Sequence, residues 1–224
     1  SLYFFGSLYG EETKIIKFLV KNLKKDDIFY DIGANYGFYT ALAQEFISNG
    51  EIHSFEPHPQ IFKLLKENAQ LDFFNNTFLN NFALSDKDGD AKFYDHFFDF
   101  HHSGMSSLIN PSTKENKQIM VKSSKLDTYI KNNRIPTIIK MDIEGGESLC
   151  LSGGIDLLSR YSPIIIMEFF NDDLHQKAVN ILLNNNYKMF QFNDGGDLYK
   201  IDDIERNKII NGLQIPQANY IFKK

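Results

Sequence analysis

The sequence predicts an α/β fold in which a mainly parallel sheet is covered by helices on both faces. Short apolar runs alternate with segments whose apolar residues recur every three or four positions, as expected for strands alternating with helices. Most of these runs also end at an acidic residue. The chain has 224 residues, 42% of them hydrophobic and 24% charged, which is enough to bury a sizeable core. We therefore expect a single domain over residues 1–224.

Seven short segments are predicted as strands, and most of them are apolar runs that end near a polar residue. They are residues 28–30, 51–55, 77–83, 137–141, 164–168, 187–192 and 219–222. Four segments carry the helical period instead. They are residues 11–23, 36–47, 61–69 and 172–184. Strands separated by helices imply right-handed crossovers and parallel pairing, with the last two strands added at the end of the chain.

Charge and cysteine content exclude several classes of protein. A net charge of −5 argues against nucleic acid as the main partner, because neutralising phosphates requires a basic face. The single cysteine, Cys150, cannot form an intramolecular disulfide and is expected to be a packed thiol. No stretch approaches the roughly 18 continuous apolar residues of a membrane span, and the start does not resemble a signal peptide. We expect a cytoplasmic protein.

Ligands of parallel α/β sheets bind at the carboxyl ends of the strands. The residues at the predicted strand ends are Asp31, Glu56, Ala83, Asp142 and Glu168. Four of these five residues are acidic. The predicted ligand site is therefore a crevice rich in carboxylates.

The first strand runs into a turn of small residues that opens a helix. Gly33 and Gly37 permit positive φ and allow a ligand to approach the backbone closely. A dinucleotide site prefers Gly-x-Gly-x-x-Gly around its diphosphate, but Asn35 replaces the middle glycine here. Asp31 would repel a phosphate and attract an ammonium or sulfonium group. The turn therefore predicts a ligand without phosphates.

Glu56 ends the second strand, where α/β nucleoside sites place a carboxylate that accepts both ribose hydroxyls. Taken alone, Glu56 could equally be a solvated strand end, and Gly33 and Gly37 could serve only tight packing. The joint placement of the turn and the acid in one βαβ unit favours a nucleoside site.

Seven motifs together resemble the class I S-adenosylmethionine-dependent methyltransferases and, more narrowly, the FkbM family. They are Asp31-Ile32-Gly33-Ala34-Asn35-Tyr36-Gly37, Ser54-Phe55-Glu56-Pro57-His58-Pro59, Asn81-Phe82-Ala83-Leu84-Ser85-Asp86, Ser106-Ser107-Leu108, Ser124-Lys125-Leu126-Asp127-Thr128-Tyr129-Ile130, Ile139-Lys140-Met141-Asp142-Ile143-Glu144-Gly145-Gly146-Glu147 and Leu151-Ser152-Gly153-Gly154. The sixth motif is the most specific. The chain departs from the family in having Gly146 where alanine is usual, and in the aromatic stretch at residues 93–105.

The resemblance implies a Rossmann-like sheet of seven strands and methyl transfer to a hydroxyl oxygen. The acceptor would be a small molecule such as a sugar, a glycan precursor or a natural product. S-adenosyl-L-methionine would be the cofactor. Its expected binding residues are Asp31, Gly33, Ala34, Asn35, Gly37, Glu56, Pro57, Ala83, Ser85 and Asp142.

Methyl transfer is a direct displacement that needs alignment and removal of a proton from the acceptor. Four residues are candidates for this chemistry: Asp142, Glu144, Lys140 and Glu168. Asp142 is either the base or a ligand of the cofactor's amino group, and Lys140 lies on the same side of the strand, where it can pair with an acid. Glu147 could take part in the same chemistry, or it could instead be an acid that stabilises the N-terminal end of the helix dipole. His175 is expected in the helix that follows Glu168, where it is either a base or, as the favoured alternative, a histidine on the helix surface.

The aromatic stretch gives two further expectations. Residues 93–108, which include Gly104, are predicted to form a flap over the substrate. The histidines and aspartates of this stretch show no spacing that would aim them at one ion, so no metal site is expected.

Two other functions fit part of the pattern. A nicotinamide-dependent oxidoreductase shares the strand, the glycine turn and the ribose acid, but lacks the phosphate-binding glycines here. A non-catalytic interaction module would retain the fold alone. Protection by NAD against thermal unfolding would favour the first, and failure to transfer methyl groups would favour the second.

Overall fold

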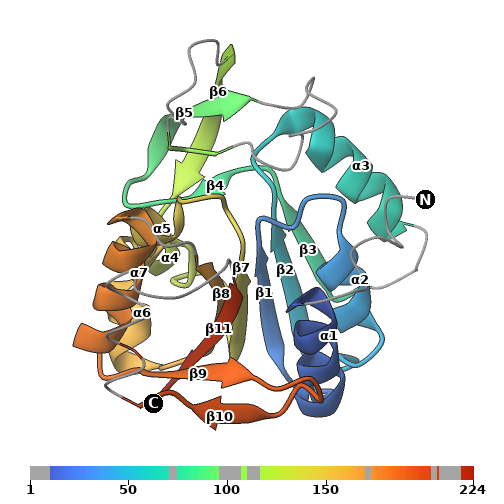
Figure 1. The fold of residues 1–224 in the computed structure, drawn as a ribbon. Coiled ribbons are helices and arrows are strands. Elements are labelled where there is room, and N and C mark those ends of the chain that lie inside the picture. The colour runs from blue at the N-terminus through green and yellow to red at the C-terminus, as the bar shows by residue number, and fades with distance from the viewer. Residues whose placement is uncertain are drawn as a thin grey trace.

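The computed structural model describes residues 11–70, 75–95, 107–109, 117–169, 173–202, 206 and 218–224. Its main sheet has eight strands in the order β10-β9-β11-β8-β7-β1-β2-β3 (Figure 1). Their bounds are β1 (Ile28–Ile32), β2 (Glu51–Phe55), β3 (Thr77–Asn80), β7 (Ile138–Met141), β8 (Ile164–Phe169), β9 (Lys188–Phe192), β10 (Leu198–Lys200) and β11 (Ala218–Lys223). Strands β3, β2, β1, β7 and β8 are parallel, and the last three are antiparallel to their neighbours. The predicted α/β class is confirmed, and β10 makes the sheet one strand wider than expected.

Helices cover both faces of this sheet. Those given by the described residues are α1 (Glu11–Asn22), α2 (Phe38–Gln44), α3 (Pro59–Gln70), α4 (Leu126–Tyr129), α5 (Glu147–Ser152), α6 (Ile155–Arg160) and α7 (Asp173–Asn184). Phe29 packs with α1 and α2 on one face, whereas Tyr30 and Ile32 pack with α5, α6 and α7 on the other. All five residues of β1 are therefore buried. No helix in the described ranges has the length and apolarity needed to cross a bilayer.

The strand predicted at residues 77–83 is shorter in the structure, so the predicted extent is wrong. Strand β3 ends at Asn80, whose carbonyl accepts the last bond from Glu56 N at 3.0 Å. The side chain of Asn81 then donates to the carbonyls of Glu56 and Pro57, which turns the chain away from β2. Ala83 consequently belongs to a second sheet.

That second sheet has three strands in the order β4-β6-β5 and was not predicted. Its strands are β4 (Ala83–Leu84), β5 (Gly89–Asp95) and β6 (Lys117–Ser124). Ala91, Phe93 and Val121 form its own small core, so the alternation of apolar residues was present in the sequence. The first part of the proposed flap at residues 93–108 is thus the end of β5. Residues 96–106, including the histidines of the aromatic stretch, lie outside the described residues.

The turn between β9 and β10 contacts α1. Lys17 Nζ donates to the carbonyl of Asp194 at 2.7 Å, and Lys21 Nζ donates to Asp197 Oδ1 at 2.7 Å. A Cβ on Gly196 would lie 2.7 Å from Lys17 Cβ, so the turn and the helix are in close contact. The unexpected strand β10 therefore helps to fix α1 against the sheet.

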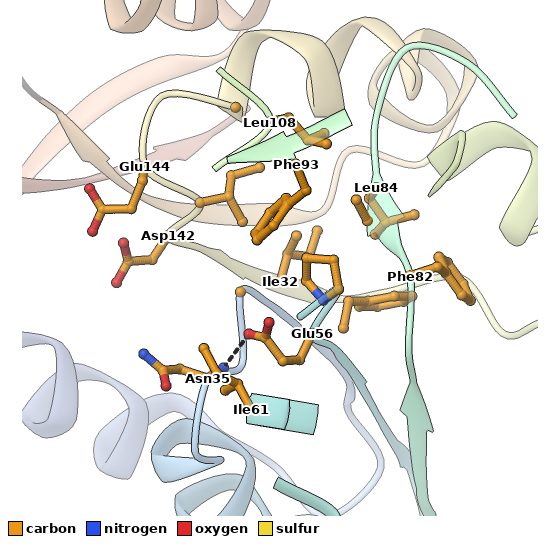
Figure 2. A pocket seen from close by; sticks show the side chains of 16 residues that line it. Ile32, Asn35, Glu56, Ile61, Phe82, Leu84, Phe93, Leu108, Asp142 and Glu144 are labelled. Atoms are coloured by element: carbon orange, nitrogen blue, oxygen red, sulfur yellow. Dashed lines mark hydrogen bonds between the residues drawn. The ribbon is translucent and has the colours of Figure 1, made fainter. Parts of the chain in front are cut away.

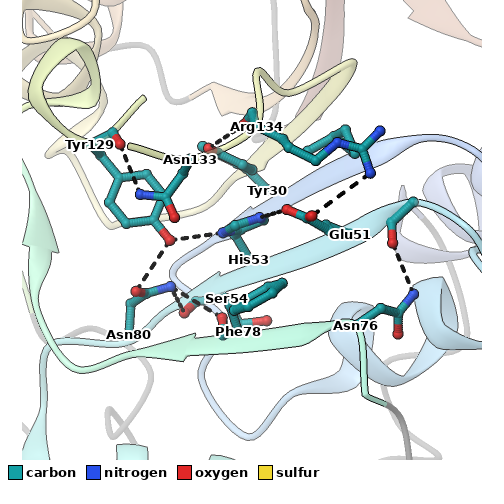
Figure 3. Close-up of polar contacts among 12 residues, drawn as sticks. Tyr30, Glu51, His53, Ser54, Asn76, Phe78, Asn80, Tyr129, Asn133 and Arg134 are labelled. Carbon is teal, nitrogen blue, oxygen red and sulfur yellow. Dashed lines mark hydrogen bonds and ion pairs between the residues drawn. The ribbon is translucent and has the colours of Figure 1, made fainter. Parts of the chain in front are cut away.

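A chain of polar contacts fastens α4 to the sheet (Figure 3). His53 on β2 is buried, with Nδ1 2.8 Å from the Tyr129 hydroxyl and Nε2 3.0 Å from Glu51 Oε2. The same hydroxyl lies 3.3 Å from Asn80 Oδ1 on β3. Burial lowers the pKa of His53. The ring of Tyr129 also packs edge-on against Phe55, at a centroid distance of 5.0 Å.

We predict that Tyr129→Phe lowers the free energy of unfolding by about 1–2 kcal/mol, because the buried Nδ1 of His53 and the half-buried Oδ1 of Asn80 lose their bond to the hydroxyl. Urea denaturation measures the change. Tyr161→Phe is the matched control, since Tyr161 is 47% exposed. Equal effects of the two substitutions would show that the contacts of Tyr129 contribute no stability.

Candidate active site

The turn after β1 is held against the ends of two neighbouring strands. Gly33 and Ala34 both donate their N–H groups to the carbonyl of Phe55 at 3.0 Å. Gly33 has φ +80°, and a Cβ there would lie 1.9 Å from the carbonyl oxygen of Asp142. Asn35 and Gly37 also have positive φ, at 51° and 90°. The small residues of this motif are thus required by backbone conformation and by contact with the end of β7.

Glu56 is bound to the turn by both of its oxygens. Oε2 accepts the N–H of Asn35 at 3.1 Å, and Oε1 accepts the N–H of His58 at 2.8 Å. The side chain is only 6% exposed. Burial raises the pKa of Glu56 to about 7, although the two N–H groups oppose this shift. The carboxylate is therefore held rigidly at the pocket wall.

These elements surround one pocket with two unlike ends (Figure 2). Asp142, Glu144 and Asn35 lie at one end, whereas Phe82 and Leu84 lie at the other. Glu56 lies between the two ends. The full lining is Ile32, Gly33, Asn35, Phe55, Glu56, Pro57, Ile61, Phe82, Ala83, Leu84, Phe93, Leu108, Asp142, Ile143, Glu144 and Gly146. The pocket thus accommodates a ligand with an apolar part, hydroxyl groups and a polar or cationic part, in that order.

Asp142 follows β7 and is paired with a buried lysine. Lys140 Nζ donates to Asp142 Oδ2 at 3.0 Å, and its side chain is 5% exposed. The same ammonium lies 4.6 Å from the ring centre of Tyr39. Burial opposes the charge of Lys140, but Asp142, Asp31 and Glu12 together raise its pKa above the ordinary value. Lys140 does not line the pocket, so it contacts the site through Asp142.

Three carboxylates converge beside the pocket. One oxygen each of Asp142, Glu144 and Glu168 lies within 4.8 Å of the others. Burial, followed by repulsion from Asp142 and Glu168, raises the pKa of Glu144 to about 8. Glu144 also has φ 54°, a conformation that favours glycine. Asp142 and Glu168, two of the predicted strand-end acids, are thus brought together with Glu144.

Glu147 and His175 lie behind this loop, within the protein. Glu147 Oε1 accepts the N–H of Ile143 at 3.0 Å, and its Oε2 is 3.6 Å from His175 Nε2. His175 is 2% exposed, so the expected surface position is wrong. Its helix, α7, packs closely against α5, which buries the imidazole. Glu147 therefore supports the loop.

Several predicted binding residues lie outside the pocket lining. Asp31 is fully buried and accepts a 2.7 Å bond from Thr40 Oγ1; burial raises its pKa. Ala34 and Gly37 shape the turn from behind. The carbonyl of Ser85 would lie 2.0 Å from a Cβ on Gly153, so Ser85 packs against the end of α5.

The sequence reasoning missed Phe82 and Leu84 at the apolar end of the pocket. Phe82 precedes β4 and Leu84 lies on it, whereas Phe93, on β5, and Leu108, between β5 and β6, fall within the segment predicted as a flap. Buried apolar residues in these places are indistinguishable from core residues in a single sequence. The buried thiol of Cys150 was predicted correctly.

The fold is that of the class I methyltransferases. The chain is similar to the precorrin-6y C5,15-methyltransferase of Geobacter metallireducens, with a TM-score of 0.54, 15% identity, and coverage of 97% of this chain and 92% of that one. It is similar to a methyltransferase FkbM of Methylobacillus flagellatus, with a TM-score of 0.54, 14% identity, and coverage of 91% of this chain and 44% of that one. It is also similar to fibrillarin of Aeropyrum pernix, solved with natively bound S-adenosyl-L-methionine, with a TM-score of 0.52, 11% identity, and coverage of 94% and 74%. At these identities the likeness concerns the fold.

The family is shown by a model of the methyltransferase FkbM domain, which matches residues 31–189. The chain belongs to the FkbM family of S-adenosylmethionine-dependent methyltransferases, as its motifs predicted. It is also similar to the hexuronic acid methyltransferase AglP of Haloferax volcanii, with 24% identity over 162 residues and coverage of 71% of this chain. The matched region spans 62% of that relative's length.

We predict that Gly33→Ala lowers the free energy of unfolding by at least about 2 kcal/mol, because the new methyl group meets a carbonyl and the positive φ is strained. Chemical denaturation measures the loss. Gly89→Ala is the control, since Gly89 has φ +122° but no atom within 4 Å of an added Cβ. An equal loss in both variants would contradict a special role for the contact with Asp142.

Proposed function

We propose that this protein transfers a methyl group from S-adenosylmethionine to a hydroxyl of a small sugar-like acceptor. The observation that carries the proposal is the order of groups in the pocket, from apolar side chains through Glu56 to Asp142 and Glu144 (Figure 2). This order matches a molecule with an aromatic base, a ribose and a sulfonium-bearing amino acid part.

A buried polar atom at the turn supports this fit. Asn35 lines the pocket, and its Oδ1 is buried and has no hydrogen-bond partner among the described residues. Such an atom fits the ammonium group of an amino acid. Phe82 and Leu84 would hold the base, and Glu56 would accept the ribose hydroxyls, because its oxygens have lone pairs left beyond the two N–H bonds. The described lining includes three carboxylates and no lysine or arginine, which disfavours the diphosphate of NAD.

When bound, S-adenosylmethionine supplies an electrophilic methyl group on a sulfonium. The protein's own residues align the acceptor and remove its proton. Asp142 is suited to this step, because its side chain is 33% exposed and Lys140 binds only one of its oxygens. The other oxygen can accept the hydroxyl proton. Lys140 is then a positioning residue, since it contacts Asp142 and does not line the pocket.

The proposed acceptor is supported by the chemistry of the polar end and by the relative that acts on a hexuronic acid. Asp142 and Glu144 present carboxyl groups that bind hydroxyls. Phe93 and Leu108 add an apolar wall of the kind that packs on a sugar ring. We propose that Phe93 and Leu108 contact the acceptor.

We predict that Glu56→Gln weakens the binding of S-adenosylhomocysteine by about 1–3 kcal/mol, as for a lost charged hydrogen bond. Isothermal titration calorimetry measures the affinity. Because the pKa of Glu56 is raised to about 7, the carboxylate fraction grows between pH 6 and 8, and the wild-type affinity should increase with it.

The increase in affinity for S-adenosylhomocysteine between pH 6 and 8 should vanish in Glu56→Gln. It should persist in Glu67→Gln, a control at an exposed position of α3. An unchanged affinity in Glu56→Gln would place the ribose elsewhere.

We predict that Asp142→Asn lowers kcat by about 10²–10⁴-fold, the usual contribution of a general base. Transfer of labelled methyl groups from S-adenosylmethionine into a pool of sugars measures the rate. Asp156→Asn, at an exposed position of α6, should retain full activity. A wild-type protein that binds S-adenosylhomocysteine but methylates no pool would favour an interaction module.

A further inference from the structure

Ser107 connects two parts of the pocket that are distant in sequence. Its hydroxyl donates to the carbonyl of Glu144 at 2.8 Å and lies 3.3 Å from the carbonyl of Ile143. The side chain is buried, with 3% of its surface exposed. Its oxygen also accepts the N–H of Ile109 at 3.1 Å. A single hydroxyl therefore joins the chain near β5 to the loop that carries the carboxylates.

The backbone that Ser107 binds is in a conformation that needs support. Glu144 has φ 54°, and Gly145 follows with φ 92°. A non-glycine residue in the left-handed region is strained, so this conformation persists only where the surroundings fix it. The direction of the Glu144 side chain depends on it. Loss of a bond to this carbonyl would thus release the carboxylate as well as the backbone.

Ser107 is itself fixed by the second sheet. Tyr94 on β5 and Ser107 exchange two backbone hydrogen bonds, of 2.8 and 3.1 Å. The neighbouring residues Phe93 and Leu108 line the pocket (Figure 2). The apolar wall and the carboxylate loop are therefore joined at this serine.

Residues other than Ser107 also hold the loop that carries the carboxylates. Glu147 Oε1 accepts the N–H of Ile143, while Ser107 binds the carbonyl of the same residue. Gly146 N donates to that carbonyl at 3.2 Å. Ile143 is thus restrained at both its N–H and its carbonyl. Of these restraints, Ser107 is the one that extends to Glu144.

We propose that Ser107 is a positioning residue for the methyl transfer, which holds the backbone at Glu144 and thereby the arrangement of Asp142 and Glu144. This inference rests on the proposed function. The serine touches the pocket only through its neighbours and through the loop. Its contribution is therefore to geometry, where displacement of a reacting group by about 1 Å can cost 10²-fold in rate.

The test uses Ser107→Ala, with hydrogen exchange followed by mass spectrometry. Amides of residues 142–147 should exchange at least about tenfold faster, because local opening of the loop becomes easier. Activity should fall at least about tenfold in kcat, since alignment is lost, while affinity for S-adenosylhomocysteine changes less than about threefold because Glu56 and the turn are untouched.

Ser123→Ala is the matched control. Ser123 is a buried serine of the same small sheet, and its hydroxyl donates to the carbonyl of Lys87 at 2.9 Å. Its loss should leave the exchange of residues 142–147 unchanged. Faster exchange there in both variants would indicate a general loosening of the sheet and would overturn the proposal.

The exchange measurement needs no turnover, so it tests Ser107 even where no acceptor is methylated. An unchanged exchange rate in Ser107→Ala would overturn the role proposed for Ser107. It would not count against the proposed methyl transfer. Should Ser107→Ala fail to fold, Ser107→Cys serves instead, because a thiol is of similar size but a weak donor. Faster exchange confined to residues 142–147 in that variant supports the proposal, and an unchanged rate overturns it.

Discussion

The site depends on a contact between two backbones, at the point where β1 and β7 both end. The Cα of Gly33 lies so close to the carbonyl of Asp142 that no side chain fits between them. This contact brings the glycine turn and the carboxylate loop to the same pocket, although more than one hundred residues separate them in the sequence. Neighbouring parallel strands make it possible, since Asp31 is paired with Lys140 and their carboxyl ends lie side by side.

Buried polar residues on three neighbouring strands form a row next to this contact. Ser54, Asp31 and Lys140 occupy paired positions on β2, β1 and β7, and Thr40 of α2 lies 2.7 Å from both the Ser54 hydroxyl and Asp31 Oδ2. Burying charges is costly unless they are paired and hydrogen-bonded. The ammonium of Lys140 meets this condition with Asp142, and Asp31 meets it in part with Thr40. The row thus links α2 to the loop that carries the proposed base.

Sequence reasoning predicted the central part of the molecule well, because its signals are local. Strand β1 begins with a sharply bounded apolar run, and Glu56 follows β2 directly, so the strand-end acids could be placed at one edge. The second sheet was missed because the alternation around Ala91 and Val121 spans only a few residues, and its two longer strands, β5 and β6, lie far apart in the sequence. The position of His175 depends on how α5 packs on α7, which no local pattern encodes. Ser107 was visible only as part of a motif, since its bonds to the loop require the tertiary structure.

The charges of the pocket explain why a Rossmann-like fold here suits a sulfonium cofactor better than a dinucleotide. A diphosphate needs free N–H groups and no anion close to the glycine turn. Here the N–H groups of Gly33 and Ala34 are taken by Phe55, and that of Asn35 is taken by Glu56. Asp142 and Glu56 further make the local field negative, and the buried Lys140 offsets it only at Asp142. A positively charged sulfur gains from this field, whereas a diphosphate would lose both its donors and its electrostatic attraction.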